Sequence, residues 1–326
     1  MQDQDKWQKI RQAFLQLWKA ILGRDDTPVR LSESVGSLAE NTEGNTEDPQ
    51  SSTEERNVGE IVNLRGLQPI ASMQTSTLTW SVPKIGTDED HNEDCVGAKF
   101  DSDAVKLRAV ICDGASSTWY SGQWAQILVE RFTCSFDETP FDWSDTTAWE
   151  EGLAECRQLW QAALPEVQHK LAYLNELAEE KRKTGAGACL VVLECDLTNN
   201  TWRAIAYGNS ILVQVRSDEV LLCGPLNEAE AFDSYTPLIS TVIDSSQPEL
   251  FLWRHCGGFT AGDEFFLLTD ELAKWLLGDI TERIELLRKQ TSQSAAEDFI
   301  AQIRGEGEVH DDDMSAIHVV IGGITA

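Results

Sequence analysis

Acidic side chains stand at the ends of several predicted β-strands, where carboxylates from different strands can do chemistry together. Four are placed in this way: Asp94 before CVGAKF, Asp113 after AVIC, Asp270 after EFFLLT, and Asp312 just before SAIHVVI. A single aspartate at a strand end is usually a turn or cap residue. Neighbouring strands lie about 4.8 Å apart, however, so acids at several strand ends can converge on one point.

Carboxylates that share a site need cations, because like charges in a poorly solvated place destabilise one another. Ligation by oxygen alone suits hard ions such as Mg²⁺, Mn²⁺ or Ca²⁺ rather than Zn²⁺. Two such ions about 3.5–4 Å apart can share a water molecule, lower its pKa and direct it at an electrophile such as phosphorus. The residues alone leave two interpretations open, a divalent-metal site or solvated acids in turns.

The overall charge and the cysteine pattern narrow the class of protein. The sequence has 26 Lys and Arg against 55 Asp and Glu, a net charge of −29, which argues against nucleic-acid binding because phosphate contacts need clustered basic side chains. No apolar run reaches the roughly 18 residues of a membrane span, and MQDQDKWQKI lacks a signal-peptide core. The eight cysteines show no zinc-type spacing, which indicates reduced thiols. Together these features predict a cytoplasmic protein.

The first 70 residues differ in character from the rest. Residues 1–24 predict a basic amphipathic helix, because apolar side chains recur at a spacing of three to four within residues 5–22. Such a helix can lie on a membrane surface, in the groove of a partner protein or on its own domain, and the pattern does not choose among these. Residues 25–70, acidic and rich in Ser, Thr and Glu, predict a flexible linker.

From residue 71 onward the sequence alternates between clusters of strands and clusters of helices. Strand-like segments occur at 78–82, 95–100, 105–112, 188–195, 202–208, 211–216, 219–223, 264–269 and 315–322. Helical patterns cover 119–133, 148–183 with a possible break at Pro165, 270–278 and 293–304. Only two residues separate 202–208 from 211–216, which predicts a hairpin between them. The clustering predicts an α+β fold.

A series of short motifs connects these elements. In chain order they are N-E-D at 92–94, D-G at 113–114, T-G-x-G at 184–187, G-x-S at 208–210, T-D at 269–270 and D-D-x-S at 312–315. Their order and strand context, over residues 72–326, resemble the metal-dependent protein phosphatases of the 2C type. The resemblance implies a four-layer α-β-β-α sandwich of two antiparallel sheets flanked by helices, forming a catalytic domain at 71–326. It also implies two Mn²⁺ or Mg²⁺ ions at one end of the sandwich.

The resemblance assigns roles to individual residues. It implies that Asp113 bridges both metal ions and that Gly114 offers its backbone carbonyl. It further implies that one ion is ligated by Asp270 and Asp312, and the other by Glu93 and Asp94, directly or through water. Asp313 and Ser315 then support the site.

The activity implied is that of a phosphoserine and phosphothreonine protein phosphatase. A metal-bridging hydroxide would attack phosphorus in line, with Asp113 and Asp94 as catalytic residues. His91 is a further candidate catalytic residue, which the family pattern does not supply. The partners implied are a phosphorylated protein substrate and the Ser/Thr kinase whose phosphorylation of that substrate this protein would reverse.

Three departures from the family pattern keep alternatives open. The family commonly has an Arg just before N-E-D that holds the substrate phosphate, whereas the segment here is Thr-Asp-Glu-Asp-His at 87–91, where His91 is either a substitute phosphate contact or a surface residue. Asn209 stands where the family has a carboxylate, and Glu271 where it has Gly. The alternatives are a regulatory or binding module of the same fold with weak or no turnover, and hydrolysis of a small phosphorylated metabolite.

Overall fold

The computed structural model describes residues 73–87, 91–134, 146–164, 172–232, 236–242 and 252–324. The predicted N-terminal helix (1–24) and linker (25–70) lie outside the described residues, so both stay predictions. Among the described helices, none is long and apolar enough to cross a membrane. Every described cysteine side chain is a free thiol, in agreement with the prediction from sequence.

Two antiparallel sheets form the centre of the described part of the chain. One, sheet A, has the strand order β1 (Met73–Val82), β11 (Met314–Ile324), β10 (Asp263–Leu268), β6 (Ile211–Arg216) and β7 (Glu219–Gly224). The other, sheet B, has the order β2 (Cys95–Asp101), β3 (Lys106–Gly114), β4 (Gly187–Asp196), β5 (Thr201–Tyr207) and β9 (Trp253–Gly258), and the short β8 (Ile239–Ser240) also pairs with β4.

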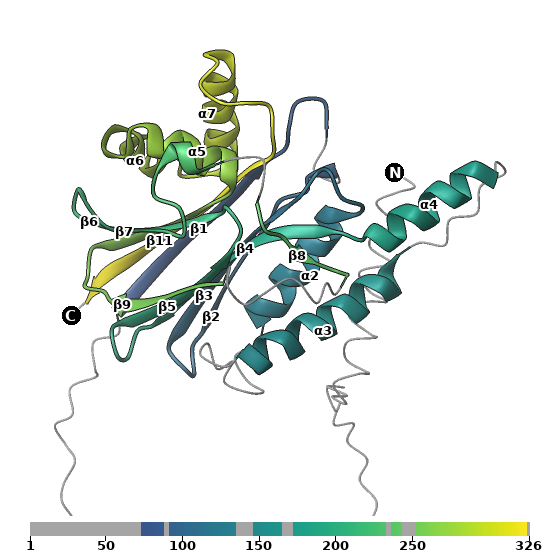
Figure 1. Cartoon of the computed structure of the whole chain (residues 1–326). Helices are drawn as coiled ribbons and strands as arrows, with labels where there is room; N and C mark the ends of the chain where they lie inside the picture. Colours follow the sequence, from purple (N-terminus) through teal and green to yellow (C-terminus); the bar gives the residue numbers. More distant parts are fainter. Residues whose placement is uncertain are drawn as a thin grey trace, which may run out of the picture. The chain divides into compact units, whose positions relative to one another are not determined.

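Helices cover the outer faces of both sheets (Figure 1). Helices α5 (Asp270–Gly278), α6 (Ile280–Arg288) and α7 (Gln293–Gly305) lie on sheet A, and α2 (Ser121–Cys134) and α3 (Thr146–Ala163) lie on the side of sheet B. The described residues also include helix α4 (Ala172–Thr184) and the 3₁₀ turn η2 (Ala229–Ala231). This is the α-β-β-α sandwich predicted from the sequence.

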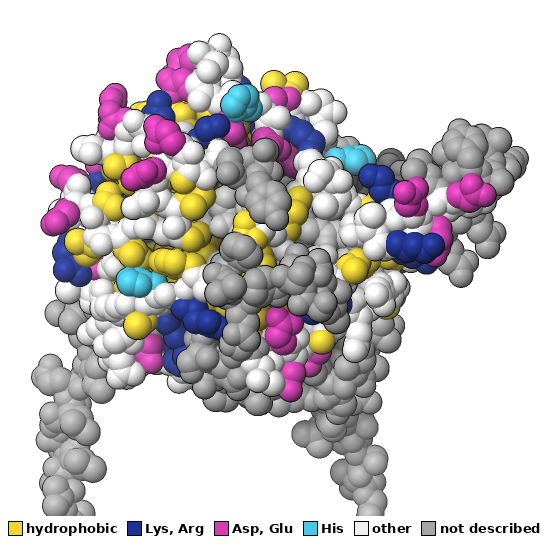
Figure 2. All heavy atoms as spheres, in the orientation of Figure 1, with side chains coloured by type: hydrophobic (Ala, Val, Ile, Leu, Met, Phe, Trp, Pro, Cys, Tyr) yellow, Lys and Arg dark blue, Asp and Glu magenta, His cyan; other side chains and the backbone are white. Residues whose placement is uncertain are grey.

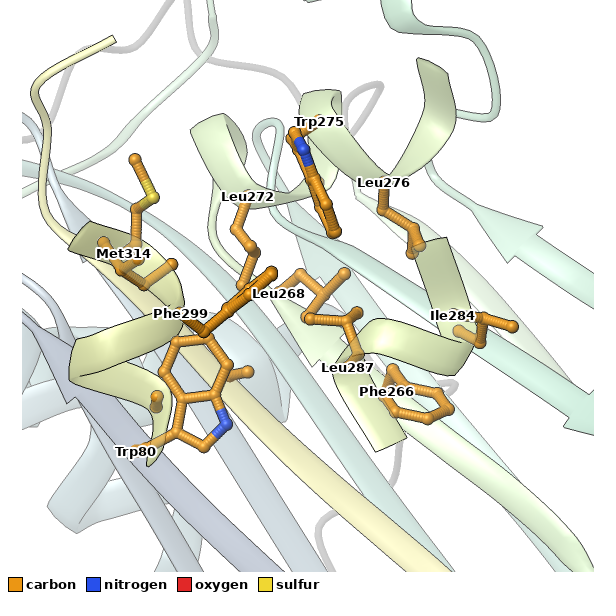
Figure 3. Close-up of a cluster of buried hydrophobic side chains, with 14 of the residues drawn as sticks. Trp80, Phe266, Leu268, Leu272, Trp275, Leu276, Ile284, Leu287, Phe299 and Met314 are labelled. Carbon is orange, nitrogen blue, oxygen red and sulfur yellow. The ribbon is translucent and has the colours of Figure 1, made fainter. Parts of the chain in front are cut away.

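Alternating side chains of the strands build the two faces of sheet A. In β10, Phe265 and Leu267 belong to the core between the sheets, whereas Phe266 and Leu268 belong to the core beneath the helices, as the period of two in a strand requires. Figure 3 shows the second core, where Trp80 from β1 and Phe299 from α7 lie beside Leu268 and Leu272. The two cores thereby fix the register of the strands and the positions of the residues at their ends.

The hairpin predicted between 202–208 and 211–216 is wrong. Strand β5 pairs with β4 and β9 in sheet B, and β6 pairs with β10 and β7 in sheet A, so the chain crosses between the sheets at residues 208–210. Both strands are buried on both faces, which the two halves of a sandwich require and an exposed hairpin does not. Gly208 has a φ of +98°, which makes the crossing possible without strain.

Other elements differ from the sequence expectations in detail. The predicted helix at 148–183 is two helices, α3 and α4, on either side of the expected break near Pro165. Strand β9 and helix α6 were not predicted. Much of β9 is exposed and its sequence, WRHCGG, contains two glycines, so it lacks the apolar signal of a strand. Helix α6 is only nine residues long, and of its four apolar residues Ile284 and Leu287 are buried.

A buried ion network connects sheet B to helix α2. The Glu194 side chain, 3% exposed, accepts hydrogen bonds from Arg108 and Arg203, while Arg108 also donates to the backbone carbonyl of Phe132 near the end of α2. Burial alone would raise the pKa of Glu194, but the two guanidinium groups hold this pKa below its ordinary value. The network helps to fix α2, whose first residue reaches the candidate site.

We predict that Glu194→Gln lowers the free energy of unfolding by about 3 kcal/mol at pH 7, because it leaves a guanidinium buried without its counter-charge. The stability that ionised Glu194 contributes is fully present above its unfolded pKa and is lost as the pH falls through its lower folded pKa. Urea unfolding between pH 7 and pH 3 should therefore show a shallower acid loss for the variant than for wild type. Equal slopes and equal stabilities would contradict the assignment.

Candidate metal centre

The two sheets bring the predicted acidic residues to one end of the sandwich. Cys95 pairs with Cys112 across β2 and β3, so the residues next to them, Asp94 and Asp113, lie at the same sheet end. On sheet A, the N–H of Thr269 donates to the carbonyl of Ser315 at 3.2 Å, which sets Asp270 beside the start of β11 and the Asp312 loop. The predicted strand ends therefore meet.

Burial and mutual repulsion govern the protonation of these carboxyls. Burial, followed by the charges of Asp270, Asp94 and Asp312, raises the pKa of Asp113 well above its ordinary value. Burial also raises the pKa of Asp94 well above its ordinary value, with Asp313 and Asp270 adding to the effect and the hydroxyls of Ser315 and Thr269 opposing it.

The two acids contributed by sheet A behave in the same way. Burial and then Asp312 raise the pKa of Asp270, and burial raises that of Asp312 as well. Each of the four predicted aspartates therefore has a pKa above its value in water, and burial is the main cause for all four. A cation bound between these aspartates would lower their pKa values again, because it favours the ionised carboxylates.

The chemistry of the donor set fits a divalent cation. All four side chains offer carboxylate oxygens, and the Oδ2 atom of buried Asp94 has no hydrogen-bond partner among the described residues. A buried carboxylate oxygen without a partner is costly unless a cation binds it. Within the described ranges, no three His, Cys, Asp or Glu side chains are already arranged as the ligands of one metal ion. The fit thus lies in the type of donor atom, in burial and in charge.

Asn209 orients one of the candidate ligands. Its Nδ2 atom donates to Oδ2 of Asp270 at 3.1 Å, and its Oδ1 accepts from the Cys189 thiol at 3.0 Å. The thiol contact fixes which way the amide faces. A Cβ added at Gly208 would lie 2.3 Å from Cys189 Sγ, so the chain must carry glycine there for this contact to form. Asn209 thus acts as a positioning residue.

Asp313 and Asn92 fasten the segment that leads to Asp94. Asp313 accepts from the backbone N–H groups of Lys84 at 2.8 Å and Glu93 at 3.0 Å. Asn92 donates to Ser81 Oγ at 2.6 Å and accepts from the N–H of Asp94 at 2.9 Å. Both carboxylate oxygens of Asp313 accept these backbone hydrogen bonds, so Asp313 holds the backbone of Lys84 and Glu93 in place.

The Glu93 carboxylate is occupied by neighbouring side chains. It accepts hydrogen bonds from the hydroxyls of Ser116 and Ser121, and Lys84 Nζ lies 2.8 Å from its Oε2. Burial alone would raise the pKa of Glu93, but the hydrogen bonds from Lys84, Ser116 and Ser121 hold it below its ordinary value. Glu93 thus differs from the four aspartates, whose pKa values are raised.

Sequence reasoning missed Lys84, although a signal was present. Lys84 is the sole Lys or Arg between Arg65 and Lys99, and it lies two residues after the end of the first predicted strand. A lone basic residue in an acidic stretch that ends in N-E-D could have been read as a counter-charge for those acids.

The two remaining predicted site residues lie in different surroundings. His91 is exposed, at the start of the segment that continues into Asn92. Gly114 is buried where two backbone segments approach each other, and its N–H donates to the Glu93 carbonyl at 3.2 Å. A Cβ at Gly114 would lie 2.6 Å from the Glu93 carbonyl oxygen and 2.8 Å from the backbone of Ser121. Only glycine lets the Glu93 segment and the start of α2 meet here.

We therefore predict that Gly114→Ala lowers the free energy of unfolding by about 1–3 kcal/mol, since backbone must move to admit the methyl group. Gly305→Ala is the matched control, because a Cβ at that helical position meets open space and alanine favours a helix. Thermal unfolding of both variants in EDTA checks this prediction. A Gly114→Ala variant as stable as wild type would show that the close approach is not tight.

Comparison with known proteins bears on the fold. The chain matches no protein-family model and no curated protein. Among solved structures, it is similar to a bacterial serine phosphatase (15% identity over 78% of this chain and 100% of the other, TM-score 0.53). It is also similar to the S. agalactiae serine/threonine phosphatase (14%, 76% and 100%, TM-score 0.50). A third similar structure is PppA, described as a regulatory component of the T6SS in Pseudomonas aeruginosa (16%, 77% and 99%, TM-score 0.50). With two antiparallel sheets, flanking helices and acids at one end, the chain has the fold of the bacterial serine phosphatases of the 2C type.

Proposed function

We propose that this protein is a metal-dependent phosphatase that hydrolyses phosphoserine and phosphothreonine in proteins, with Mn²⁺ or Mg²⁺ held by Asp94, Asp113, Asp270 and Asp312. One observation carries the proposal: four carboxyls, contributed by both sheets, lie at one end of the sandwich, where burial raises the pKa of each and the charges of Asp270, Asp94 and Asp312 further raise that of Asp113. The fold, which solved serine phosphatases share, supports it.

Bound divalent cations would supply a Lewis acid for the phosphoryl oxygens and a water of lowered pKa. Asp113 would be the carboxylate shared by both ions, since the charges of Asp270, Asp94 and Asp312 all act on it. Asn209 holds Asp270, and the hydroxyls of Thr269 and Ser315 act on Asp94, so these ligands are oriented before an ion arrives. Such second contacts to ligands generally raise metal affinity.

We infer a phosphoprotein substrate from the distribution of charge on the surface. On the face shown in Figure 2, Lys and Arg side chains are interspersed with Asp and Glu, which suits a protein substrate better than a polyanion such as nucleic acid. We propose His91, exposed at the entry to the Asn92–Asp94 segment, as a contact for the substrate phosphate. A Ser/Thr kinase that phosphorylates the same protein would be the functional partner.

A second candidate function is recognition of a phosphoprotein with weak or no turnover. The occupation of Glu93 by Lys84, Ser116 and Ser121 favours it, because Glu93 is then hindered from serving a second ion. The two functions differ in whether metal binding is followed by phosphate release.

We predict that wild type hydrolyses p-nitrophenyl phosphate and a phosphothreonine peptide with Mn²⁺ or Mg²⁺ and not in EDTA. Asp113→Asn should lower kcat/KM about 100-fold or more, since it removes a charge worth several kcal/mol in organising the ions. Phosphate release under each metal, and calorimetric Mn²⁺ binding by each variant, check this.

Asp218→Asn is the matched control, because it makes the same chemical change at a carboxylate that is 85% exposed in the β6–β7 turn. It should leave kcat/KM within about twofold of wild type. Metal binding without hydrolysis would favour the recognition function. If neither metal binds to wild type, the metal-dependent proposal is contradicted.

A further inference from the structure

Lys84 is placed at the candidate centre by its own backbone. It follows the end of β1, and its N–H donates to Asp313 Oδ1 at 2.8 Å. The next residue, Ile85, donates its N–H to Asp311 Oδ1 at 2.8 Å, and the N–H of Thr87 donates to the Lys84 carbonyl at 3.2 Å. The turn that carries Lys84 is therefore fastened to the loop before β11.

The Lys84 ammonium group lies among oxygen atoms in a manner that resembles a bound cation. Its Nζ atom is 2.8 Å from Glu93 Oε2, 3.2 Å from Ser116 Oγ and 3.7 Å from Asp313 Oδ2. Although burial opposes it, the hydrogen bond to Glu93 and the charges of Asp313 and Glu93 raise the pKa of Lys84, so the group is charged at neutral pH. Ser121 occupies Glu93 as well.

The charge balance differs between the two sides of the centre. At Glu93 and Asp313, one ammonium group faces two carboxylates, and its charge also acts on Asp312. At Asp113, the charges that act most strongly are all negative, those of Asp270, Asp94 and Asp312, and Asp94 Oδ2 is buried without a partner among the described residues. The side that still requires a cation is the side of the aspartates.

We propose that the Lys84 ammonium is a built-in cation that occupies the Glu93 side of the centre. The first divalent ion then binds at the aspartates, and a second ion binds more weakly because it must displace Lys84 from Glu93. Lys84 competes well with a dissolved divalent ion for these oxygens. Because the ammonium group is tethered beside them, its effective concentration there is high whatever the concentration of the ion in solution. This inference rests on the proposed metal-dependent function and specifies how its two ions differ.

The test is calorimetric titration of the full chain with MnCl₂, using wild type, Lys84→Met and Lys84→Arg. Wild type should bind one ion tightly and a second at least tenfold more weakly. Lys84→Met should tighten the second ion at least tenfold, equivalent to about 1.4 kcal/mol, while Lys84→Arg keeps the positive charge and should keep the second ion weak. Lys289→Met removes one charge from an exposed lysine after α6 and should match wild type.

A second measurement is independent of turnover. In EDTA, Lys84→Met should unfold at a lower temperature than wild type, because Glu93 and Asp313 lose their counter-charge. Saturating Mn²⁺ should raise the unfolding temperature of Lys84→Met more than that of wild type. Circular dichroism of each variant confirms that the fold is retained.

The outcomes separate this inference from the function on which it rests. If wild type binds two ions of equal affinity and Lys84→Met does the same, the role of Lys84 is overturned while the metal-dependent function stands. If Lys84→Met binds the second ion as weakly as wild type, the role of Lys84 is likewise overturned. If no variant binds Mn²⁺, the metal-dependent function and the inference are both overturned.

Discussion

The repulsion between carboxylates gathered at one end of a β-sandwich is the constraint on which the rest of the site depends. Burying several like charges together is unfavourable, and a folded protein accommodates it by protonation, by internal counter-charges or by bound cations. Two of these responses are visible in the chain. The pKa values of the aspartates rise, and on the Glu93 side an ammonium group and two hydroxyls satisfy the charge.

The fold provides the strength to hold this arrangement. The acids lie at or next to the ends of β2, β3, β10 and β11, and these strands belong to two sheets whose facing sides share a close-packed apolar core. Slippage of a strand by one residue would turn its core side chains outward, so the core also fixes the position of the acids. The buried Glu194 network secures α2, which brings Ser121 to Glu93.

Much of the fold could be predicted from the sequence because its strands are short, apolar and bounded by polar turns. Strand β6 and helix α5 have the predicted bounds, and the two-sheet sandwich followed from the resemblance carried by the motifs. The hairpin between β5 and β6 was predicted wrongly, since a two-residue separation does not tell whether the chain turns back or crosses to the other sheet. Long-range pairing decides this, and a local pattern does not contain it.

In the candidate site, too, the positions of the acids could be predicted from the sequence, whereas their contacts could not. That acids at strand ends would meet was predictable from their positions, and the structure brings Asp94, Asp113, Asp270 and Asp312 together. The partners of those acids were not predictable: the thiol of Cys189 that orients Asn209 and the ammonium of Lys84 on Glu93 come from residues distant in the chain or unremarkable in the sequence. Such contacts depend on side-chain geometry, which only the folded structure supplies.

Anomalous X-ray diffraction at the manganese edge, from crystals of the full chain grown with MnCl₂, tests the central claim most directly. We expect a strong anomalous peak within ligand distance, about 2.0–2.3 Å, of oxygens from Asp113, Asp270 and Asp312. The absence of a peak among these carboxylates at saturating Mn²⁺, or peaks only at exposed acids elsewhere, would contradict the claim that the strand-end aspartates form a divalent-metal centre.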